Sequence, residues 1–425
     1  MTHDATRDAG RLAQDALRRA QPLTGFQRSM LEVQLCQPTA CVLNLPMIFS
    51  MPRASVEVER FVQAMRETVD RYPIFRTVLE FDGQGRVVQR YEPRLRYELT
   101  VQEVSDEEFE ALRPTLNRPM RLFGASLVDL RLYVAQTSVH MLLSAHHVAL
   151  EATSINVLVE SIVRLYEGKE GLAPDTFYAF LDEAGQGEGR PGLAQARAYF
   201  EREYGQTAWC CNLKPDYVSD DLSSASFRFI APVTPEDLRR IRDSLGISPT
   251  EFCAQAALMA LSEVEGERDV RLSWVYQNRA NPAYRDAAGM LIALLPLGVT
   301  MDDDVAKVAA QLHERSRAAR PHSAYEWCFE HERLFESDAL FLVYEGSLLD
   351  MDAMRRMQAQ MSVPPSPTHT VLRRTSLQLV QLPQGLLFKF IYARSLYSEE
   401  HVNAYKEALL RCIERLVQFS QKGTS

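Results

Sequence analysis

The spacing of apolar residues changes from a strand period to a helix period at a pair of histidines. Between residues 138 and 146, every second side chain is apolar: Val139, Met141, Leu143 and Ala145. A period of two predicts a β-strand. Between residues 155 and 166, apolar side chains recur at helical spacing, which predicts an amphipathic helix. His146 and His147 therefore end a strand, and a short loop carrying Glu151 leads into a helix.

The same two periods alternate through the rest of the sequence. Helical spacing is found at residues 22–36, 56–71, 105–116, 193–204, 248–263, 305–318 and 398–416. Strand patterns are found at residues 41–51, 75–82, 86–91, 124–136, 270–276, 340–344, 375–382 and 386–392. Residues able to cap a helix precede some of these segments: Thr153 or Ser154, Ser105 with Glu108, and Ser248 with Glu251. Interleaved strands and helices predict an α/β fold in both halves of the chain.

A stretch rich in Gly, Glu and Pro at residues 185–192 is the best candidate for a linker. We therefore expect an N-terminal extension at residues 1–20, an N-terminal lobe at 21–185 and a C-terminal lobe at 186–425. The chain of 425 residues is long enough for each lobe to bury its own core.

The composition, with 46% hydrophobic and 24% charged residues, is that of an ordinary soluble protein. No apolar run approaches the roughly 18 residues that span a membrane, and the polar N-terminus lacks the apolar core of a signal peptide. Seven cysteines are scattered along the chain, and the close pair Cys210–Cys211 lacks the spacing of zinc ligands. We expect a cytoplasmic protein with reduced thiols, no membrane partner and no bound metal.

The net charge of −9 argues against nucleic acid as the main partner. It does not favour an acidic protein partner either, so docking of such a partner would need a local basic patch. Three arginine pairs are candidates, although such pairs are more often ordinary solvated surface: Arg18–Arg19, Arg355–Arg356 and Arg373–Arg374.

Adjacent histidines at a strand end face opposite sides of the sheet, because side chains alternate along a strand. One imidazole can then be a buried hydrogen-bonding group while the other faces a cleft, where a neutral ring can accept a proton near pH 7. The simpler alternative is that both are ordinary core or surface histidines. A strand-to-helix junction is, however, a common place for active groups. His322, His331 and His369 are expected to be loop histidines without a catalytic role.

The segment His146-His147-Val148-Ala149-Leu150-Glu151-Ala152 resembles a known motif, His-His-x-x-x-Asp-Gly. This motif marks the superfamily of chloramphenicol acetyltransferases and the condensation domains of nonribosomal peptide synthetases. Three further segments are similar to condensation-domain motifs, in the same order: Pro22–Gln27, Arg71–Thr77, and Asn278–Arg279 followed by Gly289–Leu297. The resemblance covers roughly residues 20–420. It implies a free-standing condensation domain, with two chloramphenicol-acetyltransferase-like α/β sandwich lobes in a V-shaped pseudo-dimer and a substrate channel between them.

The resemblance also implies a role for each residue of the motif. His147 matches the catalytic histidine of the family, and His146 matches the structural one. Glu151 stands at the Asp position, where it would pair with Arg279 and shape the loop. The alternative is that Glu151 is a solvated acid, favourable at the positive end of a helix. No cofactor would be bound, because the substrate would arrive on the phosphopantetheine of an acyl or peptidyl carrier protein.

Two positions depart from the family pattern. Ala152 replaces Gly, adds a Cβ and disfavours a positive φ, which puts the geometry of an oxyanion site there in question. Ala293 and Leu294 stand where Asn-Thr is usual and would make the channel wall more apolar. These changes point to an unusual donor or acceptor.

Three functions are compatible with these features. The first is a condensation enzyme, an acyltransferase that joins a carrier-bound acyl or aminoacyl thioester to an amine or hydroxyl acceptor in nonribosomal peptide or polyketide biosynthesis. The second is a polyketide-associated or coenzyme A-dependent O- or N-acyltransferase. The third is a non-catalytic condensation-like domain that recruits other enzymes, although the retained histidine pair argues against it. We expect a monomer, either natively free-standing or excised from a megasynthase.

Overall fold

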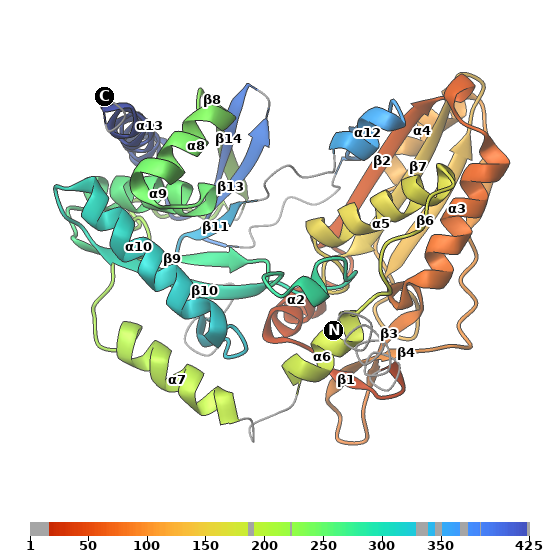
Figure 1. Cartoon of the computed structure of the whole chain (residues 1–425), viewed down its shortest axis with the longest axis horizontal. Helices are drawn as coiled ribbons and strands as arrows, with labels where there is room; N and C mark the ends of the chain where they lie inside the picture. Colours follow the sequence, from red (N-terminus) through yellow and green to blue (C-terminus); the bar gives the residue numbers. More distant parts are fainter. Residues whose placement is uncertain are drawn as a thin grey trace. The chain divides into compact units, whose positions relative to one another are not determined.

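The computed structural model describes residues 17–185, 191–221, 223–328, 339–344, 351–365, 373–382 and 384–422. The chain folds into two compact units, whose elements are labelled in Figure 1. The first unit comprises Met1–Gly187, Arg279–Leu291 and Leu348–Thr368; the second comprises Glu188–Asn278, Ile292–Ser347 and His369–Ser425. The lobe boundary expected between residues 185 and 186 stays a prediction, and it did not anticipate the two later segments that return to the first unit.

A five-stranded sheet forms the centre of the first unit, in the order β12-β2-β7-β6-β5. Its strands are β2 (Asn44–Pro52), β5 (Thr100–Glu103), β6 (Val128–Val134), β7 (Ser138–His146) and β12 (Gln360–Ser362). Strand β7 lies between β2 and β6, antiparallel to both, and its last residue, His146, is paired with Asn44. The position of the histidine pair is therefore set by a central strand that is held on both sides.

Helices pack on this sheet and on each other. The helices of the first unit are α2 (Gly25–Cys36), α3 (Val58–Arg71), α4 (Asp106–Leu112), α5 (Ala152–Tyr166), α6 (Phe177–Gly185) and α12 (Met351–Arg356). Helices α3 and α5 lie side by side along the sheet (Figure 1). Phe109 of α4 packs in an apolar cluster with Ile48, Tyr133 and Leu142 of the strands. Strands β1 (Gln21–Pro22), β3 (Thr77–Phe81) and β4 (Val87–Tyr91) form a separate three-stranded sheet, with β4 in the centre.

The second unit contains a six-stranded sheet in the order β10-β9-β11-β13-β14-β8. Its strands are β8 (Ser224–Ala231), β9 (Asp269–Tyr276), β10 (Ala293–Thr300), β11 (Phe341–Tyr344), β13 (Thr375–Leu382) and β14 (Gly385–Ala393). Its helices are α7 (Pro191–Tyr204), α8 (Pro235–Leu245), α9 (Pro249–Glu265), α10 (Val305–Ala319) and α13 (Glu399–Lys422). Helices α9 and α13 pack together, and α9 is buried along most of its length. Single 3₁₀ turns connect elements of both units: Arg53–Ser55, Pro73–Arg76, Arg113–Thr115, Pro282–Tyr284 and Arg320–His322.

The predicted alternation of strands and helices is confirmed in both units. The capping boxes at Ser105 and Ser248 form as expected. The N-cap predicted at Thr153 or Ser154 is wrong. Helix α5 begins at Ala152, and its N-cap is Glu151. The reason is tertiary, because the carboxylate of Glu151 is buried and paired with Arg279, which keeps it against the first turn of α5. Most of the predicted linker at 185–192 lies outside the described residues.

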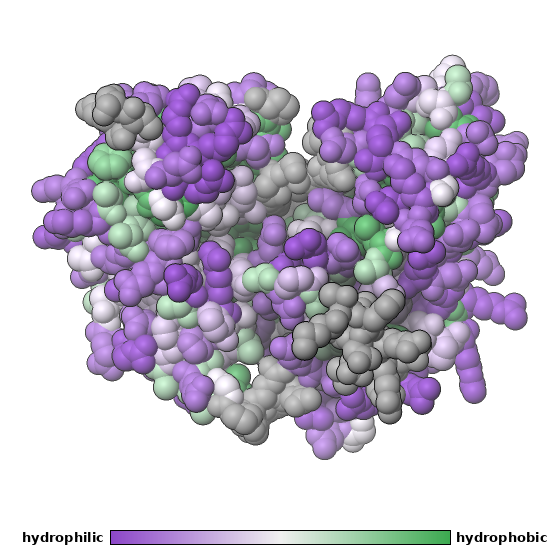
Figure 2. All heavy atoms as spheres, in the orientation of Figure 1, coloured by the Kyte–Doolittle hydropathy of each residue, from purple (hydrophilic) through white to green (hydrophobic). Residues whose placement is uncertain are grey.

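Figure 2 shows one face of the molecule, where hydrophilic residues cover most of the surface and hydrophobic residues occur in small groups. Among the described helices, none is both long and apolar enough to cross a membrane. Most of the large apolar side chains are buried in the cores of the two units, although some, such as Leu35, Phe81 and Val218, are exposed.

Candidate active site

His146 is buried at the end of β7, and both of its ring nitrogens form hydrogen bonds within the protein. Its exposed fraction is 1%, and its Nδ1 accepts a hydrogen bond from the backbone N–H of Val148 at 3.1 Å. A neutral imidazole that accepts at Nδ1 carries its proton on Nε2. That Nε2–H donates to Oε1 of Gln34 at 3.0 Å. Burial lowers the pKa of His146 to about 3, so this ring stays neutral and is held inside the protein.

His147 is half-buried and has the opposite tautomer. Its backbone N–H donates to the carbonyl oxygen of Leu43 at 2.7 Å, just beyond the end of the strand. Its Nδ1 lies 3.1 Å from the carbonyl oxygen of Leu150. A carbonyl can only accept, so Nδ1 carries a proton, and in the neutral ring the lone pair is then on Nε2. The ring therefore has the protonation pattern of a base that acts through Nε2.

Glu151 is buried, with an exposed fraction of 4%, which contradicts the alternative of a solvated acid at the helix start. Its Oε2 accepts a hydrogen bond from the backbone N–H of Thr153 at 2.7 Å and so caps α5. Its Oε1 accepts from Nη2 of Arg279 at 2.5 Å and lies 3.0 Å from Oγ of Ser154. The two oxygens of the Glu151 carboxylate therefore serve the helix cap and the guanidinium at once.

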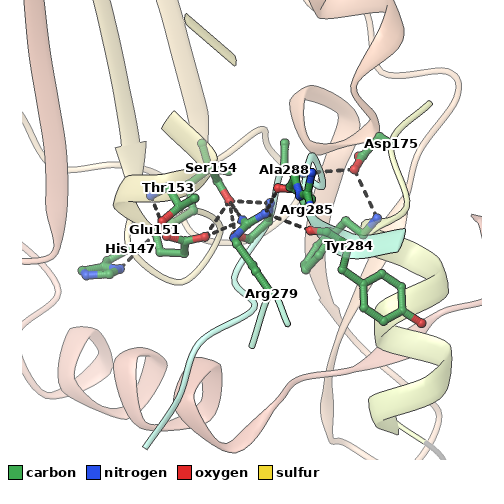
Figure 3. Close-up of polar contacts among 12 residues, drawn as sticks. His147, Glu151, Thr153, Ser154, Asp175, Arg279, Tyr284, Arg285 and Ala288 are labelled. Carbon is green, nitrogen blue, oxygen red and sulfur yellow. Dashed lines mark hydrogen bonds and ion pairs between the residues drawn. The ribbon is translucent and has the colours of Figure 1, made fainter. Parts of the chain in front are cut away.

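Arg279 comes from the returning segment at residues 279–291 and forms the ion pair with Glu151 that the family resemblance implied (Figure 3). Its Nη2 also donates to Ser154 Oγ at 2.8 Å, and its Nη1 donates to the carbonyl oxygens of Tyr284 and Arg285 at 3.0 and 2.8 Å. Figure 3 shows His147 on the other side of Glu151 from Arg279. The guanidinium of Arg279 thus binds the loop through Glu151 on one side, and the imidazole of His147 lies on the other side.

Ser154 and Asp175 were not recognised as site residues from the sequence. Both form hydrogen bonds with the returning segment at residues 279–291. The hydroxyl of Ser154 donates to the carbonyl oxygen of Gly289 at 2.6 Å, and its oxygen accepts from the N–H of Gly289 at 3.0 Å. Asp175 Oδ1 accepts from the N–H of Ala288 at 3.0 Å (Figure 3). Burial raises the pKa of Asp175 to about 6. Ser154 was considered only as a cap, and nothing in the spacing around Asp175 marks it.

Gly289 lies against the ring of Phe177, the first residue of α6. A Cβ built on Gly289 would lie 2.1 Å from the ring of Phe177, which is far inside a normal contact distance. Only glycine lets the segment pass under the start of α6 at this point. The segment can therefore reach Ser154 without displacing Phe177.

A family model for the condensation domain matches residues 18–424. The chain belongs to the condensation domain family. Surfactin synthase subunit 2 of Bacillus subtilis (strain 168) is 22% identical over 411 residues, which are 92% of this chain and 11% of that protein. Tyrocidine synthase 3 of Brevibacillus parabrevis is 22% identical over 402 residues, 90% of this chain and 6% of that protein. This condensation domain therefore spans about a tenth or less of the length of these two relatives.

Solved structures confirm the predicted mixed α/β fold. The first condensation domain of the calcium-dependent antibiotic synthetase has a TM-score of 0.71 at 18% identity, with 94% of this chain and 97% of that chain covered. The epimerization domain from the third module of tyrocidine synthetase B has a TM-score of 0.74 at 14% identity, with 94% and 98% covered. Condensation domains are acyltransferase-type enzymes that act on carrier-bound substrates, but the epimerization domain shows that this fold alone does not select one reaction.

The two positions that depart from the family pattern lie in different units. Ala152 is the first residue of α5, next to the cap, and its φ is not in the left-handed region. The expected conflict between Ala and a positive φ therefore does not arise at this position. Ala293 is the first residue of β10 in the second unit, where it is buried and paired with Tyr276. The oxyanion and channel roles of these residues stay predictions.

The remaining candidates are placed as follows. His322 stacks on Tyr199 with ring centroids 4.5 Å apart, and burial lowers its pKa; His331 and His369 lie outside the described residues. Burial raises the pKa of Cys210 to about 11, which disfavours a thiolate nucleophile. Arg356 forms ion pairs with Glu160 and Glu167 at 2.9 and 2.8 Å. Within the described ranges, no group of three or more His, Cys, Asp or Glu side chains is arranged to hold a metal ion.

Proposed function

We propose that this condensation domain joins an acyl or aminoacyl thioester to an amine or hydroxyl acceptor, with His147 as the residue that takes or orients the proton. The observation that supports this most directly is the contact between Nδ1 of His147 and the carbonyl oxygen of Leu150, at 3.1 Å. This contact supports a neutral ring with its proton on Nδ1 and its lone pair on Nε2, as a general base requires. His146 cannot share this role, because both of its ring nitrogens are used inside the protein.

In the proposed reaction, the acceptor nitrogen or oxygen attacks the thioester carbonyl carbon and forms the new C–N or C–O bond. The acceptor loses a proton to Nε2 of His147, and the carbonyl oxygen becomes an oxyanion. Collapse of this intermediate breaks the C–S bond, and the leaving sulfur takes up the proton from His147. The backbone N–H of Ala152, in the first turn of α5, is the candidate donor to the oxyanion, because first-turn N–H groups of a helix are not used within the helix.

The proposed donor is presented on the phosphopantetheine of an acyl or peptidyl carrier protein. A starter condensation domain of rhizomide synthetase, with a TM-score of 0.70 and 16% identity to this chain, has been solved in complex with C8-CoA and Leu-SNAC. Those ligands are an acyl thioester and an aminoacyl thioester, and they support thioester chemistry for this fold. They also keep coenzyme A-dependent acyl transfer as the second candidate.

We further propose that the protein acts in the cytoplasm and as a monomer. The first statement rests on the scattered cysteines and the composition, and the second rests on a channel formed within one chain in the family. Sedimentation of the purified protein across a range of concentrations tests the second, since a mass that rises with concentration would contradict it.

Intact-protein mass spectrometry of carrier proteins loaded with acyl or aminoacyl groups tests the main proposal. A panel of amines and alcohols serves as acceptors, with C8-CoA as the alternative donor. We expect transfer by the wild type and a loss of about 10²- to 10⁴-fold in His147→Ala, as for removal of a general base. His322→Ala, in the second unit, is the matched control and should keep its activity.

Each outcome decides between the candidate functions. Transfer from the carrier would support the condensation enzyme, and the accepted nucleophile would separate amide from ester formation. Transfer from C8-CoA alone would favour the second candidate. Carrier binding without transfer would favour a recruiting domain, and equal transfer by wild type and His147→Ala would rule out the role given to His147.

A further inference from the structure

Helix α2 carries two buried glutamines that reach the histidine loop from the same side. Gln27 and Gln34 lie about two helical turns apart, so both project from one face of the helix. Both are almost completely buried, with exposed fractions of 1% and 3%. Buried amides are stable only when their hydrogen bonds are satisfied, so each must have a defined set of partners.

The amide of Gln34 sets the state of His146. Its Nε2 donates to the carbonyl oxygens of Gln37 and Ala40 at 2.9 and 3.0 Å. Because both donors are used in this way, the atom that faces His146 must be Oε1, which can only accept. It accepts the Nε2–H of His146 at 3.0 Å and thereby leaves Nδ1 to accept the N–H of Val148.

The amide of Gln27 holds the same residue, Val148, by its other backbone group. Its Nε2 donates to the carbonyl oxygen of Val148 at 2.9 Å. The rest of this amide is occupied by a reciprocal pair with Gln89, at 3.1 and 2.8 Å, and by the N–H of Thr24, which donates to Oε1 at 3.0 Å. All hydrogen-bonding groups of the Gln27 amide are therefore used, and it has one stable orientation.

Val148, the residue after His147, is thus held at its C=O directly by Gln27 and at its N–H by His146, whose tautomer is set by Gln34. Phe26, the neighbour of Gln27 on α2, also lies beside the His147 ring, with centroids 6.5 Å apart. We propose that Gln27 and Gln34 are positioning residues that fix the backbone next to His147 and so hold its imidazole in place. Fully satisfied buried networks of this kind select one geometry, whereas partly satisfied ones do not.

This inference rests on the proposed function only for its effect on turnover; the positioning itself can be tested without it. The matched pair of variants is Gln27→Leu and Gln89→Leu. Both break the reciprocal amide pair at a buried site. Gln27→Leu also removes the donor to Val148 and the acceptor for the Thr24 N–H in the capping box of α2. If Gln27 mattered only for packing and for this cap, the two variants would differ in their free energy of unfolding but not in kcat or in the reactivity of His147.

For turnover, the donor and acceptor found in the transfer assay are used. We expect Gln27→Leu to lower kcat about 10- to 100-fold with KM nearly unchanged, since small misplacements of a reacting group have effects of this size. Gln89→Leu should stay within about threefold of the wild type on the same reasoning. Equal losses in both variants, or a wild-type kcat in Gln27→Leu, would overturn the proposal.

The readout that does not depend on activity is the reaction of His147 with diethyl pyrocarbonate, followed by peptide mass spectrometry. We expect faster modification of His147 in Gln27→Leu than in Gln89→Leu, because a released loop exposes both ring nitrogens. Equal rates would contradict the positioning role even if the protein transfers no acyl group. Absence of transfer by the wild type, with a difference in these rates, would count against the proposed function alone.

Gln34→Glu tests the second glutamine through pH. Glu keeps an acceptor for the Nε2–H of His146 and adds a negative charge, which favours a protonated ring. It also loses the donors to the carbonyl oxygens of Gln37 and Ala40. A protonated His146 cannot accept the N–H of Val148 at Nδ1. A general base at His147 makes the wild type pH-dependent as well. We therefore expect kcat to begin to fall at a higher pH in this variant than in the wild type, between about pH 5 and 8, and the diethyl pyrocarbonate pattern of His147 to change over the same range. Profiles that coincide with those of the wild type would overturn the role of Gln34.

Discussion

Each unit contains a helix that begins beside a buried glutamate, and the two sites differ in what the glutamate holds. In the second unit, Glu251 is the third residue of α9 and closes a capping box with Ser248. Hydrogen bonds from Ser248, Ser316 and His313 outweigh the effect of burial and hold its pKa below the usual value. In the first unit, Glu151 precedes α5 and binds a segment that lies far along the sequence.

The two glutamates differ in the residues that they contact and in the residues that precede them in the sequence. The contacts of Glu251 come from its own helix start and from the region of α10, with Arg320 at 3.6 Å. Those of Glu151 include Arg279 and, through Ser154, Gly289. A strand ending in two histidines leads to Glu151, and the glutamines of α2 hold that strand end. Buried helix-start glutamates are thus a structural device in both units, and only the first supports a group suited to proton transfer.

The largest expected difference between the two sites concerns their arginines. Arg279→Leu should lower the free energy of unfolding by about 3–5 kcal/mol, because it leaves Glu151 buried without its counter-charge. Arg320→Leu should cost about 1 kcal/mol or less, since its side chain is partly exposed and Glu251 keeps its other partners. Urea unfolding of both variants measures the difference, and equal costs would show that the two glutamates are held alike.

The second prediction concerns pH. The folded pKa of His146 is about 3, whereas that of an unfolded histidine is about 6.5. The unfolded chain therefore binds more protons between these values, and stability from this residue is present above pH 6.5 and is lost as the pH falls. Between pH 7 and pH 5, this contribution is about 2 kcal/mol.

The variant His146→Asn isolates this contribution. Asn can keep a donor and an acceptor but does not titrate, so the wild type should lose about 2 kcal/mol more than the variant when the pH falls from 7 to 5. Comparing the two proteins removes the opposite contribution of Asp175, whose pKa is raised. Parallel pH profiles of wild type and variant would show that His146 is not held neutral.

The smallest effect is expected at the first turn of α5. Ala152→Gly should cost less than about 1 kcal/mol, as should the control Ala306→Gly in the first turn of α10. If the Cβ of Ala152 crowds the reacting carbonyl, transfer should rise in Ala152→Gly and stay constant in the control. Unchanged transfer in both would remove Ala152 from the oxyanion site.

Much of the fold could be predicted because local patterns carry it. The strand ending at His146, the capping boxes at Ser105 and Ser248, and the alternation of strands and helices follow from side-chain period and from short-range hydrogen bonds. The pairing of Glu151 with Arg279 was expected only through a family resemblance. No local rule connects two residues at that separation.

The sequence by itself determined that two histidines end a strand, that an acid follows them before a helix, and that the chain alternates strands with helices. These are consequences of residue spacing. Only the tertiary structure decided that Glu151 and not Thr153 or Ser154 caps α5, that Ser154 holds Gly289, and that Gln27 and Gln34 fix the backbone beside His147. The physical reason is that buried polar groups must find partners, and those partners come from whichever distant segments the packing brings within hydrogen-bonding distance.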